Sequence, residues 1–275
     1  MAKYPPIVGH TLATPELNLE SAVELFSRLG LDGVEIVQDD GYACGLSSRP
    51  DPGELINLRR QLESAGLTAW HITPYVRTLD SADDDIRSEA IADVKNAIEV
   101  ADFLGARGVR ILAGRREGEG STIRFERFLD SMRKLATIAS LAAVSLNIET
   151  KGWSFGSTTD SMLRLIRGID SPAVGILFDP ANLVLDGENA SLALRGQLAW
   201  VRHVHVKDVL VGDGGEGRFT RLGTGSVPWR DLLQQLRQAG FNGALSLEYE
   251  RRWDRDLEPF DEIAPADITL LRSTT

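Results

Sequence analysis

The chain has 275 residues, of which 43% are hydrophobic, and it carries a formal net charge of −10. This hydrophobic content supports a large buried core, whereas nucleic-acid backbones and anionic membrane surfaces repel the negative charge. Cys44, the single cysteine, has no partner for an internal disulfide, and the sequence has neither a signal-peptide-like start nor a run of about 18 apolar residues. We therefore expect a cytoplasmic protein that binds neither nucleic acid nor membrane.

Short β-rich segments alternate with longer segments of helical periodicity along the whole chain. The expected strands cover residues 7–12, 33–38, 67–75, 108–114, 145–150, 174–182, 201–209 and 243–250. The expected helices follow them at residues 18–30, 52–66, 81–105, 123–143, 158–169, 190–200, 228–240 and 265–272. Strict alternation of strand and helix predicts parallel strands joined by helical crossovers.

Eight such units predict a (β/α)8 TIM barrel, an α/β fold in which closure of eight parallel strands removes the exposed edges of the sheet. An open doubly wound sheet is the alternative topology. No stretch is typical of a linker, so we expect one domain over residues 1–275. The long glycine-rich segment 211–226 is interpreted as a loop over the active site rather than as a domain boundary.

Polar residues at the C-terminal ends of barrel strands are candidate site residues, because active sites of TIM barrels lie there. The expected strands end with His10, Glu35, His71, Glu149, Asp179 with Asn182, His205 with Lys207 and Asp208, and Glu248 with Glu250. The last four strands thus supply in turn a glutamate, an aspartate, a histidine and a glutamate, each preceded by apolar residues. Carboxylates this far inside apolar strands are costly to bury unless they are paired or bound to a metal.

Three carboxylates and one imidazole form an oxygen-rich ligand set with one nitrogen. Such a set favours one divalent metal ion, with Mn²⁺, Mg²⁺ or Co²⁺ preferred and Zn²⁺ as a further option. The histidine comes from the stretch VRHVHVKDV, where His203 and His205 share one face of a strand. We interpret His205 as the ligand and His203 as a hydrogen-bonded core histidine.

Five motifs follow one another from residue 145 onward, namely NIET, FDPANL, HVHVKD, LGTGSVPW and SLEYE. Their order resembles the xylose-isomerase-like barrel superfamily of sugar and sugar-phosphate isomerases, epimerases and dehydratases, which also includes endonuclease IV. The resemblance implies that Glu149, Asp179, His205 and Glu248 bind one divalent metal. It also implies that Glu149 and Glu248 flank the substrate carbon and are the catalytic residues.

Two positions depart from the usual pattern of the ketose 3-epimerases in that superfamily. Asn182, which we expect to contact the substrate, stands where these enzymes usually carry a histidine, and Val211 stands where they usually carry an arginine. Arg218 and Arg221 lie further along the same loop and can replace that arginine in binding a polar group or phosphate of the substrate. The departures leave the exact sugar open.

Further polar residues are expected to bind the substrate. His10 and His71 end strands and are predicted to line the pocket, whereas Lys151 and Lys207 can neutralise charge that develops on the substrate. Glu35, which ends the second strand, is equally compatible with a salt bridge at the rim of the barrel, as is Glu250.

Two enzymatic reactions fit these residues. The first is isomerisation or epimerisation of a small hydroxy-carbonyl sugar through a metal-stabilised cis-enediolate, with a glutamate moving the proton. The second is a lyase or dehydratase reaction that forms the same enediolate and then expels a β-hydroxyl or an alkoxide. In either case we expect a small sugar as the binding partner, and a homo-oligomer is compatible with such a barrel.

Two other classes of protein are less compatible with the sequence. An endonuclease IV-like repair enzyme needs several metals, but the chain has only four histidines and an acidic balance. A metal-free binding protein would have to bury Glu149, Asp179 and Glu248 together without a cation, which is energetically unfavourable.

Overall fold

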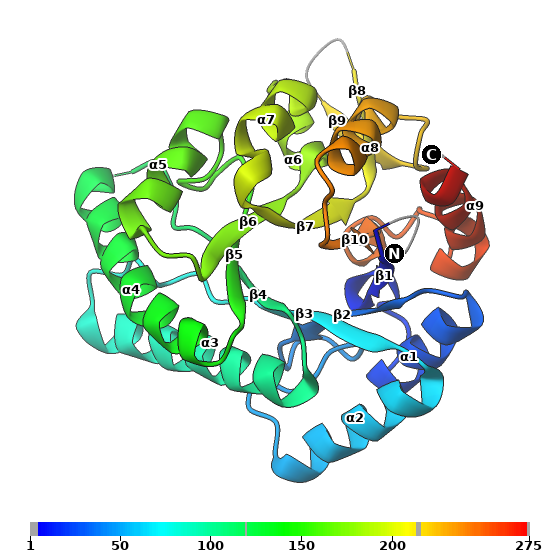
Figure 1. Ribbon diagram of the computed structural model, residues 1–275, viewed down its shortest axis with the longest axis horizontal. Helices are drawn as coiled ribbons and strands as arrows, with labels where there is room; N and C mark the ends of the chain where they lie inside the picture. The colour runs from blue at the N-terminus through cyan, green and yellow to red at the C-terminus, as the bar shows by residue number, and fades with distance from the viewer. Residues whose placement is uncertain (1–4, 119, 213–215, 274–275) are drawn as a thin grey trace.

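Eight parallel strands close into a barrel, and helices surround it on the outside (Figure 1). The strands are β1 (Ile7–His10), β2 (Gly33–Gln38), β3 (Thr68–Pro74), β4 (Gly108–Ile111), β5 (Ser145–Glu149), β6 (Val174–Phe178), β7 (Val201–Val206) and β10 (Ala244–Leu247). Their order around the barrel is β1-β10-β7-β6-β5-β4-β3-β2. This computed structural model describes residues 5–118, 120–212 and 216–273. The predicted TIM barrel is confirmed.

The connecting segments are largely helical and follow the cap chemistry of the sequence. They are η1 (Thr11–Ala13), α1 (Leu19–Arg28), α2 (Pro52–Ala65), α3 (Asp84–Leu104), α4 (Ser121–Leu141), α5 (Thr159–Ile169), α6 (Pro180–Leu185), α7 (Ala190–Gln197), η2 (Leu198–Trp200), α8 (Trp229–Gln238), η3 (Glu250–Arg252) and α9 (Phe260–Ser273). Asp51 and Asp83 accept backbone N–H bonds at the starts of α2 and α3, and Gly66 and Gly105 end these helices at φ of 68° and 72°. Glycine adopts such left-handed angles without a steric penalty. Among the described helices, none is both long and apolar enough to cross a membrane.

The sixth strand ends at Phe178 rather than at residue 182 as the sequence predicts. Asp179 instead caps the short helix α6, because its side chain accepts a hydrogen bond from the backbone N–H of Asn182 at 3.0 Å. Pro180 suits the first position of this helix, where its missing N–H is not needed. The cap brings Asp179 and Asn182 together at the mouth of the barrel.

The seventh strand is also shorter than predicted and ends at Val206. Asp208 begins β8 (Asp208–Val211), which pairs antiparallel with β9 (Gly217–Thr220). The Asp208 carboxylate also accepts backbone N–H bonds from Gly223, Gly225 and Val227. The predicted loop 211–226 therefore includes a strand and an anchored turn, and its residues 213–215 lie outside the described part of the chain.

The last helix, α9, begins at Phe260 and contains Pro265, whereas the sequence predicts a helix that begins at that proline. Two carboxylates, Asp261 and Glu262, lie in its first turn. They favour an earlier start because negative charge is stabilised by the N-terminal end of the helix dipole.

The inner face of the barrel is polar toward its C-terminal end. The strand register places Glu35 of β2 beside both His10 of β1 and His71 of β3, and it places His205 of β7 beside Ser246 of β10. All five side chains are buried. The interior of a TIM barrel is usually filled by branched apolar residues, so this polar layer marks the end of the barrel where chemistry takes place.

Candidate active site

Four of the predicted site residues converge where strands β5, β6, β7 and β10 end. Glu149 is the last residue of β5, Asp179 follows β6, His205 lies near the end of β7 and Glu248 follows β10. One oxygen or nitrogen atom of each lies within 4.8 Å of those of the others. All four side chains are buried, so this carboxylate cluster concentrates negative charge in a region with little water.

His205 lies between the other three members of the carboxylate cluster and a further carboxylate deeper in the barrel. Its Nδ1 is 3.1 Å from Glu248 Oε2, 3.9 Å from Asp179 Oδ2 and 4.0 Å from Glu149 Oε1. Its Nε2 is 3.1 Å from Glu35 Oε1. Burial disfavours a charged imidazole, but Glu248 and Glu35 outweigh this effect and hold the pKa of His205 well above its ordinary value. The ring therefore experiences a strongly negative potential.

The Nδ1 atom of His205 is a buried nitrogen that forms no hydrogen bond with any described residue. Such atoms are rare in folded proteins, because an unpaired buried polar group costs free energy. This nitrogen faces one oxygen from each of three carboxylates. A donor set of this kind fits a divalent cation such as Mn²⁺, Mg²⁺, Co²⁺ or Zn²⁺.

Lys207 lies among the carboxylates rather than at the edge of the pocket. Its Nζ is 2.7 Å from both Asp179 Oδ2 and Glu250 Oε1, and it also contacts Glu248 Oε2. Burial of a lysine lowers its pKa, but Asp179, Glu248 and Glu250 outweigh this effect and raise the pKa of Lys207 well above its ordinary value. Glu250 thus forms the salt bridge considered for it from the sequence, with Lys207 as its partner, but in a buried position.

Glu149 accepts hydrogen bonds on both of its carboxylate oxygens. Arg110 Nη1 donates to Oε2 at 3.2 Å, while Lys151 Nζ and Asn182 Nδ2 donate to Oε1 at 3.2 and 3.3 Å. The carboxylate cluster thus adjoins two residues that are predicted to bind the substrate, Lys151 and Asn182. Arg110 was not predicted, although a charged residue inside the apolar strand segment GVRILAG was a signal that could have found it.

The charges around the cluster do not balance within the protein. The contact network holds five carboxylates, those of Glu35, Glu149, Asp179, Glu248 and Glu250. It holds three permanently cationic side chains, Arg110, Lys151 and Lys207, of which only Lys151 is partly exposed, at 27%. With His205 neutral, as a metal ligand must be, two negative charges remain among these described groups, which is the charge that one divalent cation neutralises.

A row of stacked side chains flanks Glu149. The Arg110 guanidinium lies 4.3 Å from the ring centre of Tyr75, which stacks on Tyr42 at 4.9 Å, and Arg252 lies 4.9 Å from the ring of Tyr42. Cation–π and stacking contacts of this kind favour one fixed arrangement of planar groups. They connect β4 with the segments that follow β2, β3 and β10 on one side of Glu149.

The other four residues predicted to bind the substrate, two histidines and two arginines, lie in different surroundings. His10 and His71 are buried beside Glu35, and burial lowers the pKa of His10 to about 4 and that of His71 to about 3. Arg221 forms an ion pair with Glu258 and is 60% exposed, and Arg218 is exposed on β9. Of these four residues, His10 is the one that borders the carboxylate cluster, with Nε2 4.0 Å from Glu248 Oε1.

Glu35 is fully buried inside the barrel. The rim salt bridge considered for it from the sequence is therefore wrong. The strand register accounts for the difference, because β2 places Glu35 level with His10 and His71 on its two neighbouring strands.

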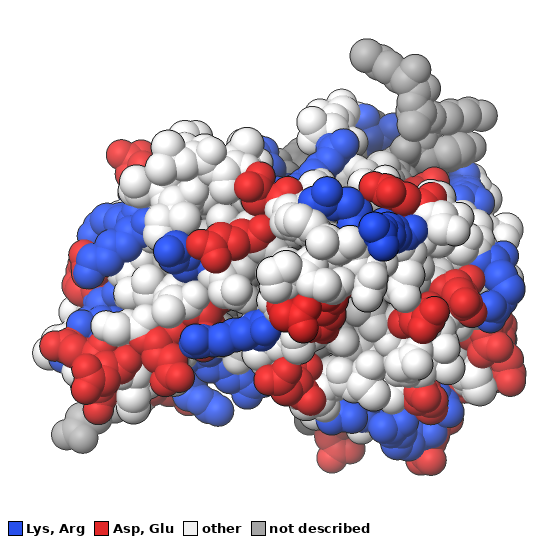
Figure 2. Space-filling view, turned by 90° about the horizontal axis from the view of Figure 1, so that it is seen from below, with Lys and Arg blue, Asp and Glu red and all other residues white. Residues whose placement is uncertain are grey.

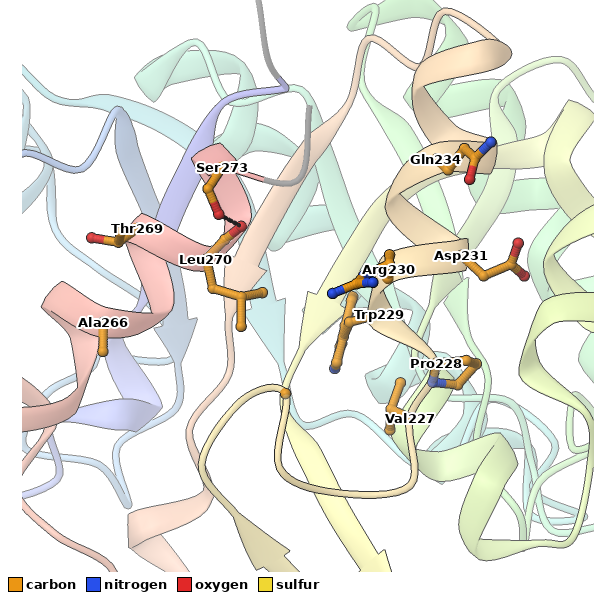
Figure 3. A pocket seen from close by; sticks show the side chains of 11 residues that line it. Val227, Pro228, Trp229, Arg230, Asp231, Gln234, Ala266, Thr269, Leu270 and Ser273 are labelled. Carbon is orange, nitrogen blue, oxygen red and sulfur yellow. Dashed lines mark hydrogen bonds between the residues drawn. The ribbon is translucent and has the colours of Figure 1, made fainter.

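A separate cavity of about 880 Å³ lies between α8 and α9 (Figure 3). Its lining includes Pro228, Arg230 and Asp231 on one side and Ala266 and Thr269 on the other. None of the residues of the carboxylate cluster contributes to it. We therefore place the candidate active site at the strand ends, where the titratable groups converge.

Comparison with known proteins identifies sugar-processing relatives. The sequence profile of the family described as xylose isomerase-like TIM barrel matches residues 23–274. The L-ribulose-5-phosphate 3-epimerase UlaE of Escherichia coli strain K12 is 28% identical over 193 residues. That match covers 68% of this chain and 65% of the relative, so the chain spans less than two thirds of that protein.

Solved structures share the fold along the whole chain. The xylose isomerase domain protein of Planctomyces limnophilus has a TM-score of 0.77 at 22% identity, covering 100% of this chain and 98% of that one. The D-allulose 3-epimerase of Methylomonas sp. has a TM-score of 0.80 at 16% identity, covering 100% and 99%. At these identities the likeness establishes a common fold.

Because Lys207 is buried among carboxylates, we expect its replacement to lower the stability of the protein strongly. In chelator-treated protein, Lys207→Met should lower the free energy of unfolding by about 3 kcal/mol, because it leaves buried carboxylates without their cation. Urea denaturation at pH 7.5 measures this change. Lys134→Met is the matched control, since Lys134 pairs with Asp130 at 2.8 Å while both side chains are 59% exposed. That variant should lose less than about 0.5 kcal/mol.

The loss in Lys207→Met should also depend on pH. In the wild type, burial raises the pKa values of Glu248 and Asp179, but His205 and Lys207 outweigh it and lower them. Their stabilising contribution is thus complete above the unfolded pKa values near 4 and is lost as the pH falls through the folded ones. Without Lys207 the folded state binds protons more readily, so the deficit should shrink between pH 7.5 and pH 4.5. An equal deficit at both pH values, or one no larger than that of Lys134→Met, would contradict this account.

Proposed function

This chain belongs to the xylose isomerase-like TIM-barrel family, and on that basis we propose that it is a metal-dependent isomerase or epimerase of a small hydroxy-carbonyl sugar or sugar phosphate. The observation that carries the proposal is the carboxylate cluster at the strand ends, with a buried His205 Nδ1 that faces three carboxylates, the nearest at 3.1 Å. The name of the UlaE relative, an L-ribulose-5-phosphate 3-epimerase, supports a ketose or ketose phosphate as the substrate class.

The metal would be held by Glu149, Asp179, His205 and Glu248, with Mn²⁺, Mg²⁺ or Co²⁺ preferred and Zn²⁺ as an option. When bound, a divalent ion would supply Lewis acidity. This favours loss of a proton from the carbon next to a carbonyl, which gives a cis-enediolate. Lys151, at the partly exposed edge of the cluster, is placed to neutralise negative charge that develops on the substrate.

Glu248 is better placed than Glu149 to take the first proton. Among the described residues, none donates a hydrogen bond to Oε1 of Glu248, and Nε2 of His10 lies 4.0 Å away. Both oxygens of Glu149 accept hydrogen bonds from cationic side chains, which lowers their basicity. We therefore assign the first abstraction to Glu248 and delivery on the opposite face of the carbon to Glu149.

The remaining predicted residues have supporting positions. Asn182 donates to both Glu149 and Asp179, so it orients two of the proposed ligands. The exposed Arg218 and Arg221 stay predicted contacts for a polar group or phosphate of the substrate. Arg221 would have to leave Glu258 to make such a contact.

Two alternative activities can be distinguished from isomerisation or epimerisation, one by its products and the other by the ligands that it requires. A lyase or dehydratase would share the enediolate but release water or an alkoxide, so product analysis distinguishes it. An endonuclease IV-like activity needs further metal ligands, whereas all four histidines of this chain lie around Glu35. On the face shown in Figure 2, basic and acidic side chains are interspersed, which does not favour a nucleic-acid backbone.

Metal content gives the first test. Metal-depleted wild-type protein titrated with Mn²⁺ should bind one equivalent and gain thermal stability, because a ligand of the native state stabilises it. His205→Ala should lose this binding. Glu250→Gln, which alters a neighbouring carboxylate outside the proposed ligand set, should still bind one equivalent at saturation. Calorimetric titration and elemental analysis measure both quantities, and full metal content in His205→Ala would remove His205 from the ligand set.

Deuterium exchange tests the roles of the two glutamates. Ketoses and their phosphates are incubated in D₂O with the Mn²⁺-loaded protein, and exchange at the α-carbon and product formation are followed by NMR after removal of the metal. Glu248→Gln should lower both by about 10²-fold or more, since it removes the first base. Glu149→Gln should keep exchange but lose net epimerisation, because the proton returns to the same face.

The outcomes of this test distinguish an error in the roles assigned to Glu149 and Glu248 from an error in the proposed function. Exchange in Glu248→Gln but not in Glu149→Gln would reverse the two roles. Wild-type rates in both metal-loaded variants would show that neither glutamate is the base.

A further inference from the structure

All four histidines of the chain face the carboxylate of the fully buried Glu35. The facing atoms and their distances to the nearest Glu35 oxygen are His203 Nε2 (2.7 Å), His205 Nε2 (3.1 Å), His10 Nε2 (3.5 Å) and His71 Nδ1 (3.6 Å). These residues come from β1, β2, β3 and β7, so only the closed barrel brings them together. We call these five residues the histidine–glutamate hub.

The hydrogen bonds around His10 determine which of its nitrogens carries a proton. The backbone N–H of Leu12 donates to Nδ1 of His10 at 3.1 Å, so Nδ1 must offer its lone pair. The single proton of the His10 ring is therefore on Nε2, and it points toward the Glu35 carboxylate.

A chain of donors determines the proton position in His71. The Ser145 hydroxyl donates to the carbonyl of Arg107 at 3.0 Å, so Ser145 Oγ accepts the 2.9 Å bond from the Asn147 amide nitrogen. The same amide nitrogen lies 2.8 Å from His71 Nε2 and donates its other hydrogen there. The neutral ring consequently carries its proton on Nδ1, which faces Glu35.

These N–H groups, together with a hydroxyl, surround Glu35 as an anion. The Thr73 hydroxyl donates to Glu35 Oε1 at 2.5 Å. His10 and His71 therefore direct protons rather than lone pairs at Glu35, so neither of these two rings offers a metal ligand to the hub.

We infer that Glu35 is a positioning residue that keeps the proton of His205 on Nε2 and so leaves the Nδ1 lone pair for a metal ion bound in the carboxylate cluster. Nε2 of His205 lies 3.1 Å from Glu35 Oε1, and Nδ1, at the opposite side of the ring, faces the carboxylate cluster, with Glu248 Oε2 at 3.1 Å. The carboxylate also determines the direction of the ring, which is held between Glu35 and Glu248. This role rests on the proposed function only insofar as His205 binds a metal.

Wild-type protein labelled with ¹⁵N in its histidines gives the first test, because four imidazoles are few enough to resolve by NMR. In metal-depleted protein at pH 7.5, the single protons should be on Nε2 of His10 and on Nδ1 of His71. After one equivalent of Zn²⁺ is added, His205 should carry its proton on Nε2 and coordinate through Nδ1. Opposite tautomers of His10 and His71 would overturn the hub, and coordination of Zn²⁺ through Nε2 of His205 would overturn the positioning role.

Glu35→Gln gives the second test, because it keeps the shape of the side chain and removes the charge. We expect Zn²⁺ affinity to fall about 10- to 100-fold, the usual effect of losing a carboxylate behind a metal-bound histidine. The fraction of His205 with its proton on Nε2 should fall as well. Thr73→Val is the matched control, since it removes one hydrogen bond to the same Glu35 oxygen, and it should keep the tautomer and the affinity within about threefold.

The results separate three outcomes. A merely structural role for Glu35 would lower the stability of Glu35→Gln but leave the His205 tautomer and the Zn²⁺ affinity of the folded fraction unchanged, and this would overturn the inference. Absence of Zn²⁺ binding in the wild type would contradict the proposed metal site, while the tautomers of His10 and His71 would still decide whether the hub exists. If Glu35→Gln does not fold, the wild-type spectra alone decide between Nδ1 and Nε2 as the ligand atom.

Discussion

The burial of five carboxylates at one end of a closed barrel is the constraint on which the rest of the site depends. Each buried charge is costly unless a cation or several donors lie against it. Lys207 contacts three of these carboxylates, and Arg110 and Lys151 hold Glu149. With His205 neutral, the remaining excess of two negative charges lies around this residue, which connects the two groups of acids. The proposed metal would neutralise this excess, and the proposed proton transfer uses two of the same carboxylates, Glu149 and Glu248.

Strand geometry explains why two histidines stand two residues apart in an apolar strand. His203 and His205 face the same side of β7 but lie at different depths, so His203 contacts Glu35 while His205 also reaches Glu248. Their neighbours on β10 are small, Ala244 and Ser246, which leaves room for two rings. The deeper histidine stabilises the anion that orients the outer one, so structural and functional histidines belong to one network.

Much of the fold was predictable from the sequence because its signals are local. Strand and helix alternation predicts the barrel, and the polar residues that end the strands predict that Glu149, Asp179, His205 and Glu248 meet. The boundaries that differ have local causes that compete with strand formation, such as the cap at Asp179 and the anchored turn at Asp208. The order of strands and helices is enough to predict a barrel, whereas the exact ends of these strands depend on single hydrogen bonds.

The parts that were not predicted depend on contacts across the barrel. Glu35 and His205 are 170 positions apart, and whether a glutamate at a strand end points to the rim or inward depends on register. Arg110 and Glu149 belong to adjacent strands whose pairing places the arginine beside Asn147. Lys207 is predicted to contact the substrate, but its contacts with acids from two strand ends, those of β6 and β10, were not predicted. Such pairings follow from the closed sheet rather than from any stretch of sequence.

The most direct test of the account is a crystal structure of the protein grown with Mn²⁺, with anomalous diffraction used to locate the ion. The account predicts one anomalous peak per chain at the carboxylate cluster, with His205 Nδ1 and oxygens of Glu149, Asp179 and Glu248 at coordination distance. A peak bound by other residues, a second peak within the histidine–glutamate hub, or no peak at the cluster at saturating Mn²⁺ would contradict it.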